Sequence, residues 1–442
     1  MGNQSTRPGI VLLTGIFASL TLKACPDLSN LYQTLAVNPE QAELELSELV
    51  DACSESSEYF AMLGAARLAS GNLFQALENL ELSLLIDPDN GSALVDYAEV
   101  MYRQGDIFSA LELNSELLTR DDLPSGLKGA LSARQRRWER ERIQRNLIVA
   151  GFVGYDHNLN SAPVSDQLAL TLSGNSVILD VSPEYQAQEG AYAKVLTGAN
   201  FRRLGRSLSG QFSGQITGRF SDDSQHELLQ ASNQVVITET RSQPRWDAFF
   251  RLDHVVYGGN SIFSSSTVMA RYLFRPDRAC VVYPKAAFQY QYFYEQRSLT
   301  GVEKSFGVGA DCNLRWLGVA NRVGMEVSHL SNEGTRSGRL GSDRDGWRMN
   351  LVWRRQIGAG AIFAQYVQTQ LDDSEGYSPI FDLGQKREET LNSFFVQYTR
   401  PLTRLGRTAQ FFSNLSYHDQ NSTIDLFKTR GFATEIGINW GL

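Results

Sequence analysis

The sequence predicts a multidomain α plus membrane β fold: an N-terminal tetratricopeptide (TPR) α-solenoid, then an antiparallel outer-membrane β-barrel of about 14 strands. Three observations lead to this prediction. Small residues recur every 34 positions near the N-terminus. From Leu147 onward the helical period disappears, and bulky apolar residues alternate with small or polar ones. Connections after even-numbered expected strands are short, and the long insertions all follow odd-numbered strands, as in barrels with short turns at one end and longer loops at the other.

Composition is compatible with such a barrel and excludes other classes. The chain has 442 residues, 42% of them hydrophobic, which is enough for two or more domains. Beyond the N-terminus it holds no run of about 20 apolar residues, so a multi-helix membrane domain is excluded. Barrels escape that test because half of each strand faces a polar lumen. The net charge of −8 argues against a nucleic-acid partner.

Residues 1–24 have the pattern of a secretory signal peptide. Arg7 precedes an apolar segment at 9–22 that is too short to span a membrane comfortably, and Ala24 is a plausible cleavage point. Leu22-Lys-Ala-Cys25 is also a candidate lipidation box, in which Lys23 is a poor residue. We therefore expect export, with lipidation of Cys25 left open.

The four cysteines fall into two local pairs. Cys25 and Cys53 would join neighbouring helices, and Cys280 and Cys312 would join adjacent strands of one hairpin. Disulfides are reasonable in an exported protein, and buried free thiols are the alternative. The spacing shows no Cys-x-x-Cys pair or cysteine–histidine cluster, so we predict no metal site and no cofactor.

Residues 25–124 are expected to form TPR-like repeats. Ala42, Ala76 and Ala110 are 34 residues apart, as are Gly71 and Gly105. The best unit runs from about residue 57 to 90, and three units are about the minimum for a stable stack. Such a stack offers a concave surface to a protein partner. The residues expected to bind it are Phe60, Arg67, Tyr97 and Tyr102. A helical bundle with an accidental period is the alternative.

Residues 125–146 are expected to form a basic connecting helix. Its arginines surround a narrow apolar stripe that includes Leu131 and Trp138. A solvated connector that caps the last repeat explains this pattern most simply. A basic collar near lipid or at a pore mouth is the alternative.

The barrel is expected over residues 147–442, with strands long enough to span a membrane when tilted. The expected strands are 147–156, 190–204, 207–221, 226–241, 244–257, 261–275, 279–295, 301–316, 321–332, 346–357, 360–372, 388–400, 408–419 and 427–442.

Loop lengths support this assignment. Connections after even-numbered strands are short, while the long insertions at 157–189, 333–345 and 373–387 each follow an odd strand. A soluble sandwich has no reason to segregate loop lengths in this way. An even strand count places both barrel ends on the periplasmic side, so we expect an outer-membrane protein with its N-terminal domain in the periplasm.

Alternation along the strands separates a lipid face from a lumen face. Val323, Met325 and Val327 alternate with polar residues, and the tyrosine-rich stretch 288–294 would form an aromatic girdle. The residues expected to face the lumen are Arg322, Glu326, Arg348, Asn350 and Arg354. Charges of both signs predict a lumen with hydrophilic contents or internal ion pairs.

The last strand resembles the sorting signal that closes bacterial outer-membrane barrels. The residues that carry the resemblance are Glu435, Gly437, Trp440 and Leu442. It implies recognition by the barrel assembly machinery and contact with outer-membrane lipid. An ordinary edge strand of a soluble sandwich is the alternative.

A secretion signal, a short TPR stack and a 14-stranded barrel together resemble the surface lipoprotein assembly modifier family. The segment Gly154-Tyr-Asp-His-Asn-Leu-Asn-Ser-Ala-Pro163 is similar to the Asp-x-Asn-x-Asn segment that opens barrels of that family. The resemblance implies a periplasmic TPR region that engages client lipoproteins and a barrel that assists their passage to the surface. It implies no catalytic residues. A calcium loop at Asp156, Asn158 and Asn160 is disfavoured, since Ser161 replaces the required glycine and the closing glutamate is absent.

Two other functions remain open. Arg322, Arg348 and Arg354 could line a pore that exports an anionic polysaccharide. His329-Leu-Ser331-Asn332 resembles the His-x-Ser-Asn segment of outer-membrane phospholipase A and of lipid A deacylase. Residues two apart on a strand share a face, so His329 could serve as the base for Ser331. Against an acyl hydrolase, the motif is short, and the expected third member could come only from Asp343 or Asp345. We therefore expect no enzymatic activity.

Overall fold

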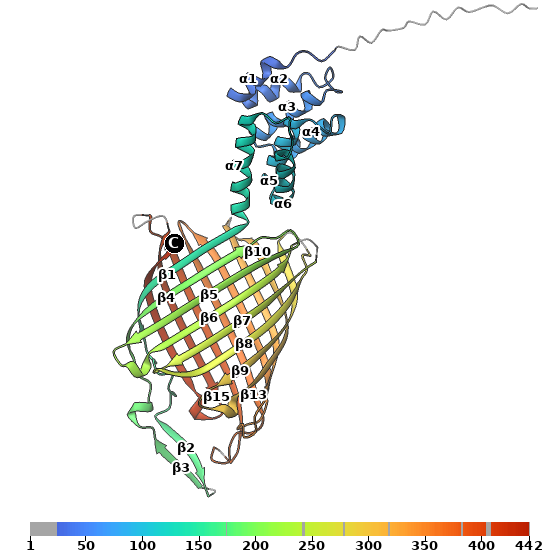
Figure 1. The fold of residues 1–442 in the computed structure, drawn as a ribbon. Helices are drawn as coiled ribbons and strands as arrows, with labels where there is room; N and C mark the ends of the chain where they lie inside the picture. The colour runs from blue at the N-terminus through green and yellow to red at the C-terminus, as the bar shows by residue number, and fades with distance from the viewer. Residues whose placement is uncertain are drawn as a thin grey trace, which may run out of the picture. The chain divides into compact units, whose positions relative to one another are not determined.

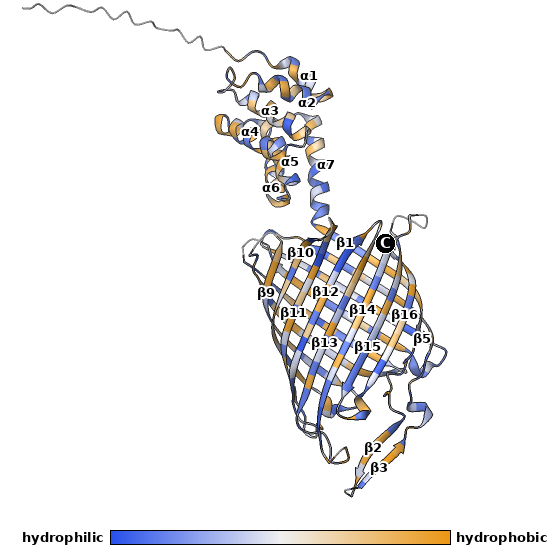
Figure 2. Cartoon of the chain, turned by 180° about the vertical axis from the view of Figure 1, so that it is seen from behind, coloured by the Kyte–Doolittle hydropathy of each residue, from blue (hydrophilic) through white to orange (hydrophobic). Residues whose placement is uncertain are grey.

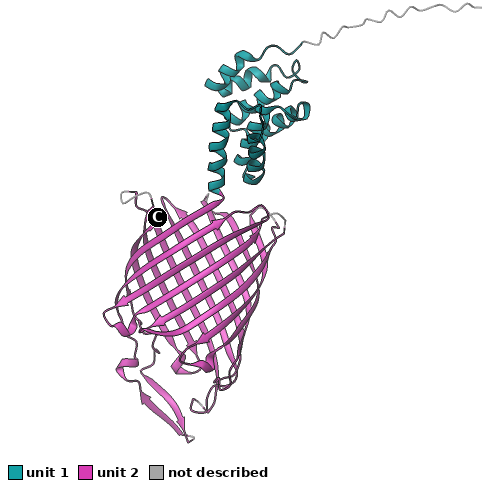
Figure 3. Ribbon diagram, in the orientation of Figure 1, with its two compact units in different colours: residues 1–141 teal, residues 142–442 magenta. Residues whose placement is uncertain are grey.

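The computed structural model describes residues 24–441 except 174, 241–243, 277–278, 317–318, 382 and 404–407. The expected signal peptide, apart from Ala24, and the expected sorting residue Leu442 lie outside the described residues. The chain forms two compact units divided after Glu141, one helical and one a barrel (Figure 1, Figure 3). The predicted fold class is confirmed.

The helical unit contains three consecutive helix pairs and a seventh helix. The pairs are α1 (Ser29–Val37) with α2 (Pro39–Ser47), α3 (Ser57–Ala69) with α4 (Leu73–Ile86), and α5 (Gly91–Arg103) with α6 (Ile107–Leu118). The seventh helix is α7 (Ser125–Glu141). Among the described helices, none is long and apolar enough to cross a membrane.

The 34-residue period has a direct structural cause. Ala42, Ala76 and Ala110 are fully buried in the second helix of each pair, where a larger side chain would not fit. Gly71 and Gly105 follow the first helix of the second and third pairs with φ of +84° and +92°. Glycine adopts this left-handed conformation without a Cβ penalty, so it permits the sharp turn into the next helix. The period therefore marks repeated packing and repeated turns.

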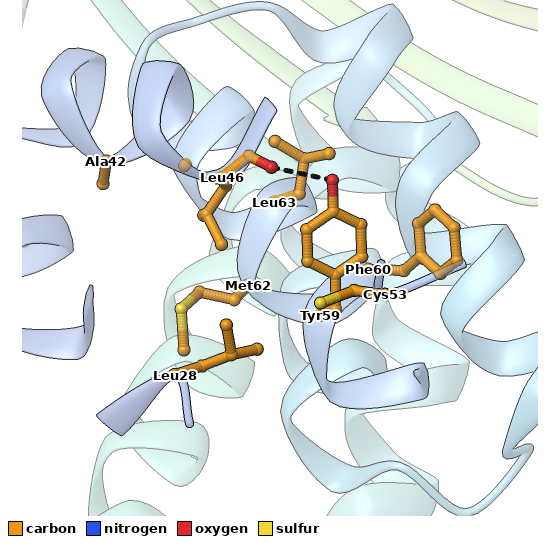
Figure 4. Packing of buried hydrophobic residues seen from close by; sticks show 9 residues of the cluster. Leu28, Ala42, Leu46, Cys53, Tyr59, Phe60, Met62 and Leu63 are labelled. Carbon is orange, nitrogen blue, oxygen red and sulfur yellow. Dashed lines mark hydrogen bonds between the residues drawn. The ribbon is translucent and has the colours of Figure 1, made fainter. Parts of the chain in front are cut away.

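The first repeat is held to the second by a buried cluster. Tyr59 of α3 is fully buried and donates a hydrogen bond of 2.9 Å from its hydroxyl to the carbonyl of Leu46 (Figure 4). The Phe60 ring lies edge-on to the Tyr59 ring at a centroid distance of 5.1 Å, and Leu28, Met62 and other apolar side chains belong to the same cluster (Figure 4). The Cys25–Cys53 disulfide is present beside the same cluster. Cys25 lies in the segment before α1, and Cys53 lies in the segment between α2 and α3.

The seventh helix closes the stack with an apolar face. Trp138 is fully buried and stacks on Tyr102 at a centroid distance of 4.7 Å. The helix ends at Glu141, which corrects the expected helix over 125–146. Residues 143–146 already belong to the first barrel strand, because they continue the ladder in which Ile143 pairs with Arg203.

The second unit is a closed antiparallel barrel of 14 strands. Each strand pairs with its sequence neighbour, and β1 closes the ring by pairing with β16. The barrel strands are β1 (Ile143–Asp156), β4 (Gly190–Arg203), β5 (Leu208–Ser221), β6 (Leu228–Glu239), β7 (Arg245–Tyr257), β8 (Asn260–Leu273), β9 (Cys280–Phe293), β10 (Gly301–Trp316), β11 (Val319–Gly334), β12 (Arg344–Ile357), β13 (Gly360–Gly376), β14 (Lys386–Pro401), β15 (Ala409–Ser422) and β16 (Thr429–Gly441).

The two ends of the barrel differ as predicted. At one end, here called the turn end, β1 begins, β16 ends and the connections are short. The other end, the loop end, carries the long insertions. The insertion at 157–189 contains a hairpin, β2 (Gln167–Leu172) with β3 (Asn175–Asp180), where the sequence pattern predicts only a loop (Figure 1). Strands β11 to β14 extend further than expected, so two long loops shorten to 335–343 and 377–385.

Side chains alternate between the two faces of the barrel wall. Figure 2 shows this as alternating polar and apolar positions along the strands. Val323, Met325 and Val327 are exposed on the outer face, although a soluble protein would bury such residues. The Cys280–Cys312 disulfide is present and joins directly paired residues of β9 and β10. The wall thus has the pattern of a membrane barrel with a polar lumen.

Candidate functional sites in the helical unit and the barrel lumen

The helical repeats carry a strongly one-sided charge. Residues 25–124 hold nineteen Asp or Glu and only three Lys or Arg. The negative field of such a surface repels nucleic acid and attracts cationic segments. A protein partner of this unit is therefore expected to carry positive charge where it binds.

The four expected partner-binding residues differ in burial and in the contacts that they make. Phe60 is 7% exposed and belongs to the core cluster, so it packs the unit instead of presenting a contact surface. Tyr102 is covered on one face by Trp138, and its hydroxyl donates a 2.6 Å hydrogen bond to Glu141. This hydrogen bond and burial raise the pKa of Tyr102. Arg67 is half-buried against Glu43, and the hydroxyl of Tyr97 donates to Glu81 at 3.3 Å. The role of these four residues in binding stays a prediction.

An exposed apolar stripe on α4 was missed in the sequence analysis. Phe74 is 72% exposed and Leu85 is 79% exposed, and they lie three helical turns apart on one face. Leu82 is exposed beside them, and Glu78 and Glu81 lie on the same side. The signal was present in the sequence, since α4 has more apolar residues than one buried face can hold. Large exposed apolar side chains in a group mark an interaction surface.

A polar contact links α5 to α7. The Arg134 guanidinium donates to the Asn114 side chain at 2.8 Å and to the carbonyl of Val95 at 3.0 Å. Asp96 lies near it, and burial raises the pKa of this carboxyl to about 6 although Arg134 acts in the opposite direction. Asp96 is therefore still mostly ionised at neutral pH, but its ionisation costs more free energy in the folded unit than in the unfolded chain.

Within the lumen, Glu435 of β16 forms the most connected site near the closing strand. Its carboxylate accepts hydrogen bonds from the Tyr192 hydroxyl at 2.8 Å and from Asn414 at 2.9 Å, and it forms an ion pair with Lys194. Tyr192 and Lys194 lie on β4, so these bonds cross over β1. They pass above Gly154, where a Cβ would lie only 2.6 Å from the Tyr192 ring. The group fastens β4 to β16 across the seam where the barrel closes.

The five residues expected in the lumen lie on the inward face of β11 and β12, on the alternate positions to the exposed Val323, Met325 and Val327. Glu326 pairs with Lys285, and Arg348 lies 3.4 Å from Glu303. Asn350 accepts a 3.0 Å hydrogen bond from Gln365. Arg322 has a long contact of 3.7 Å with Asp311, and Arg354 lies 5.0 Å from the centre of the Phe363 ring.

Charge is distributed unevenly along the lumen. Towards the loop end the inward carboxylates are paired, as in the contact of Arg387 with the fully buried Asp373 at 3.0 Å. Arg387 is held between the rings of Tyr377 and Phe427 at 4.7 and 4.6 Å. Near the turn end the inward arginines Arg202, Arg315 and Arg354 have no carboxylate partner within the described residues. The turn end of the lumen is therefore the more positive end.

A polar cavity of about 490 Å³ lies against the inner wall. Its lining combines amide, charged and aromatic side chains, including Gln230, Gln234, Arg251, Gln289 and Phe249. Surfaces of this kind suit hydrated solutes or polar polymers, since amides both donate and accept hydrogen bonds.

The residues of the hydrolase alternative lie on the outer face of β11. His329 is exposed and pairs with Trp347 of β12, while Ser331 pairs with Asp345. Serine, histidine and an aspartate thus share one patch of the outer face near the loop end. Within the described part of the chain, however, no side-chain hydrogen bond joins His329 to Ser331. Ser331, His329 and Asp345 are therefore neighbours on the barrel wall, but they do not form a hydrogen-bonded catalytic triad in the structure.

The Asp-x-Asn-x-Asn segment has a structural role. Asn158 is buried and bonds the backbone of Ala162 in both directions and the carbonyl of Arg430 at 2.9 Å. Asn160 similarly bonds the backbone of Gln186 and Gln188. These contacts anchor the 157–189 insertion to the barrel. Among the described residues, no group of three or more histidine, cysteine or acidic side chains is placed to hold a metal ion.

The closing strand shows why its residues are small inside and bulky outside. A Cβ on Gly437 would lie 2.4 Å from the carbonyl oxygen of Gly151 and 2.6 Å from the Phe152 ring. Trp440 lies on the outer face opposite Val149 of β1. The role of Glu435, Gly437 and Trp440 as a sorting signal stays a prediction.

Searches against known proteins give structural likeness only. No protein-family model and no curated protein sequence matches the chain. The helical unit resembles the structure of the Yersinia enterocolitica type III secretion chaperone SycD in complex with a peptide of the translocator YopD. Identity is 20%, over 26% of this chain and 89% of that one, with a TM-score of 0.23. PcrH in complex with the chaperone-binding region of PopD gives 22% identity over 26% and 92%, with a TM-score of 0.23.

The barrel resembles an anion-selective porin from Comamonas acidovorans. Identity is 10%, over 68% of this chain and 99% of the porin, with a TM-score of 0.35. These low values carry no functional argument, and the class follows from the strands and helices themselves. The chain is a β-barrel protein of the outer-membrane type. It carries a TPR-like helical unit directly before its first strand, with only Arg142 between α7 and β1.

Proposed function

We propose that this protein is an outer-membrane translocation or assembly factor. It docks a periplasmic protein client on the helical unit and assists export of that client to the cell surface, through the barrel or beside it. The observation that carries the proposal is the direct fusion of a TPR-like unit to the first strand of a closed barrel. Such repeats commonly serve as protein-binding surfaces, and the fusion keeps a bound client near the membrane.

The proposed docking surface is the outer face of α4. Phe74, Leu82 and Leu85 supply exposed apolar area, and Glu78 and Glu81 supply negative charge beside it. A client segment that fits this face combines apolar and basic side chains. By its resemblance to surface lipoprotein assembly modifiers, the client class is a lipoprotein, and barrel insertion depends on the barrel assembly machinery. The helical unit then resides in the periplasm.

Site-specific photocrosslinking in cells tests this proposal. A crosslinking amino acid at Phe74 or Leu85 should capture an exported protein, whereas the same amino acid at exposed Ser115 on α6 should not. Glu78→Lys with Glu81→Lys should reduce both capture and the client's appearance at the surface. Asp121→Lys, at an exposed residue outside α4, is the charge-reversal control. Equal capture from positions 74, 85 and 115 would count against a docking role for α4.

Export of an anionic polysaccharide is a second candidate function. It is favoured by Arg202, Arg315 and Arg354, which lack carboxylate partners near the turn end within the described residues. An open pore of this kind should conduct anions preferentially in a planar bilayer, and Arg354→Glu should lower that selectivity. A barrel that conducts no ions would exclude this candidate and leave the client-docking function in place.

A further inference from the structure

A tryptophan belt marks one edge of the apolar wall. Four of the six tryptophans, Trp246, Trp316, Trp353 and Trp440, lie on the outer face close to the turn end. Tyr272 extends this belt. Amphipathic aromatic rings prefer the boundary between the hydrocarbon core and the headgroups. The outer face near these rings therefore lies at the depth of the lipid headgroups.

Beside the belt, arginines point outward instead of into the lumen. Arg145 pairs with Phe201 in the β1–β4 ladder, and its guanidinium lies 5.7 Å from the centre of that exposed ring. Three other arginines also occupy outward-facing positions near the turn end. We call the whole set the seam-side arginines: Arg145, Arg203, Arg355 and Arg400. None of them has a carboxylate partner among the described residues.

The arrangement is asymmetric around the barrel. The strands that carry the seam-side arginines, β4, β1, β14 and β12, belong to the half of the barrel that contains the β1–β16 seam. On the outward face of the turn end, the described strand residues include one acidic side chain, Glu239, and it lies on β6 in the other half. The positive charge therefore gathers on the seam side.

The opposite edge of the wall has a different chemistry. At the loop end, outward-facing Lys304 pairs with Glu333 at 2.6 Å, and Arg430 pairs with Asp419 at 2.8 Å. These cations are neutralised by the protein itself. The seam-side arginines have no such internal counter-ion among the described residues, and a guanidinium binds phosphate through paired hydrogen bonds.

We infer that the seam-side arginines bind anionic phospholipid headgroups in the leaflet that meets the turn end, and so hold lipid against the closing seam. Trp440 and Val149 place apolar surface on the seam for the acyl chains of the same lipids. This inference rests on the barrel alone and is independent of any client of the helical unit.

The test uses the full-length protein in neutral detergent micelles. Phosphatidylglycerol with brominated acyl chains is titrated against tryptophan fluorescence, with brominated phosphatidylcholine as the comparison. The wild-type protein should be quenched at lower concentrations of phosphatidylglycerol. Raising salt from about 0.05 M to about 0.5 M should weaken that preference, because exposed charges are screened. Replacement of the four arginines by glutamine should weaken phosphatidylglycerol binding by at least about tenfold.

Two control variants separate this effect from misfolding and from a general loss of positive charge. Arg322→Gln with Arg354→Gln removes two lumen charges and should keep the preference. Lysine at all four seam-side positions should retain most of it. Heat-modifiable electrophoretic mobility reports whether each barrel is folded. Equal quenching by the two lipids, or an unchanged preference in the glutamine variant, overturns the inference. Displacement of the lipid by low concentrations of inorganic phosphate would also overturn it, by showing a site for free anions.

Discussion

Replacement of Glu435 by glutamine should loosen the closing seam of the barrel. The carboxylate accepts hydrogen bonds from Tyr192 at 2.8 Å and Asn414 at 2.9 Å and pairs with Lys194. Glutamine keeps one acceptor oxygen and places an amide group where a second carboxylate oxygen lies. Lys194 then loses its counter-ion and keeps a neutral acceptor oxygen and its contact with the Phe152 ring at 4.8 Å.

The expected decrease in the free energy of unfolding is moderate, because the Glu435 site borders the lumen. The side chains of Lys194 and Glu435 are 22% and 13% exposed, so water screens the pair in part. Breaking a fully buried pair costs about 3–5 kcal/mol, and a charge-assisted hydrogen bond contributes about 1.5–3 kcal/mol. We expect Glu435→Gln to lower the free energy of unfolding by about 2 kcal/mol, or about 30-fold in the equilibrium constant.

Urea unfolding of the full-length protein in phospholipid vesicles measures this change, with heat-modifiable mobility as the readout of the folded barrel. Adding Lys194→Met to Glu435→Gln should cost less than the sum of the two single changes, with a coupling of about 1 kcal/mol. Ser416→Ala, which removes one long hydrogen bond of 3.5 Å in the neighbouring strand, is the control. Wild-type stability in Glu435→Gln, or additive costs in the double variant, would refute a fastening role for this group.

Four further outcomes are expected. Deletion of residues from Trp440 onward should block membrane insertion in a heat-modifiability assay and leave the helical circular dichroism intact; normal insertion would contradict the sorting role. Cys53→Ser should destabilise the helical unit by about 3 kcal/mol, because the Cys25–Cys53 bond closes a loop of 28 residues, and an unchanged midpoint of helical melting would count against it. Asp96→Asn should stabilise the helical unit above pH 6 and flatten its pH dependence. With a folded pKa of about 6 against 3.8, Asp96 favours folding at low pH, and that contribution is lost as pH rises through 6; equal melting of wild type and variant at pH 7.5 would exclude this. Ser331→Ala should leave fatty-acid release from outer-membrane lipid unchanged at background, and serine-dependent release would establish a hydrolase instead.

The sequence determined the architecture to a large extent because both units rest on simple periodicities. Ala42, Ala76 and Ala110 occur every 34 residues since each repeat packs the same way. Alternation along the strands and the parity of loop lengths predicted 14 strands, since one wall separates lipid from a polar lumen. A period in sequence records a local requirement that each element meets separately.

Only the tertiary structure decided which side chains meet. Glu435 reaches Lys194 across 241 residues of sequence, because β1 lies between β16 and β4 in the closed ring. Phe60 is an aromatic residue of the kind that often binds partners, but packing against the core buries it. Phe74 on the next helix is exposed. The seam-side arginines are scattered in sequence and become one surface through strand register and barrel closure. Contacts of this kind depend on which elements are neighbours in space, and local pattern does not encode that.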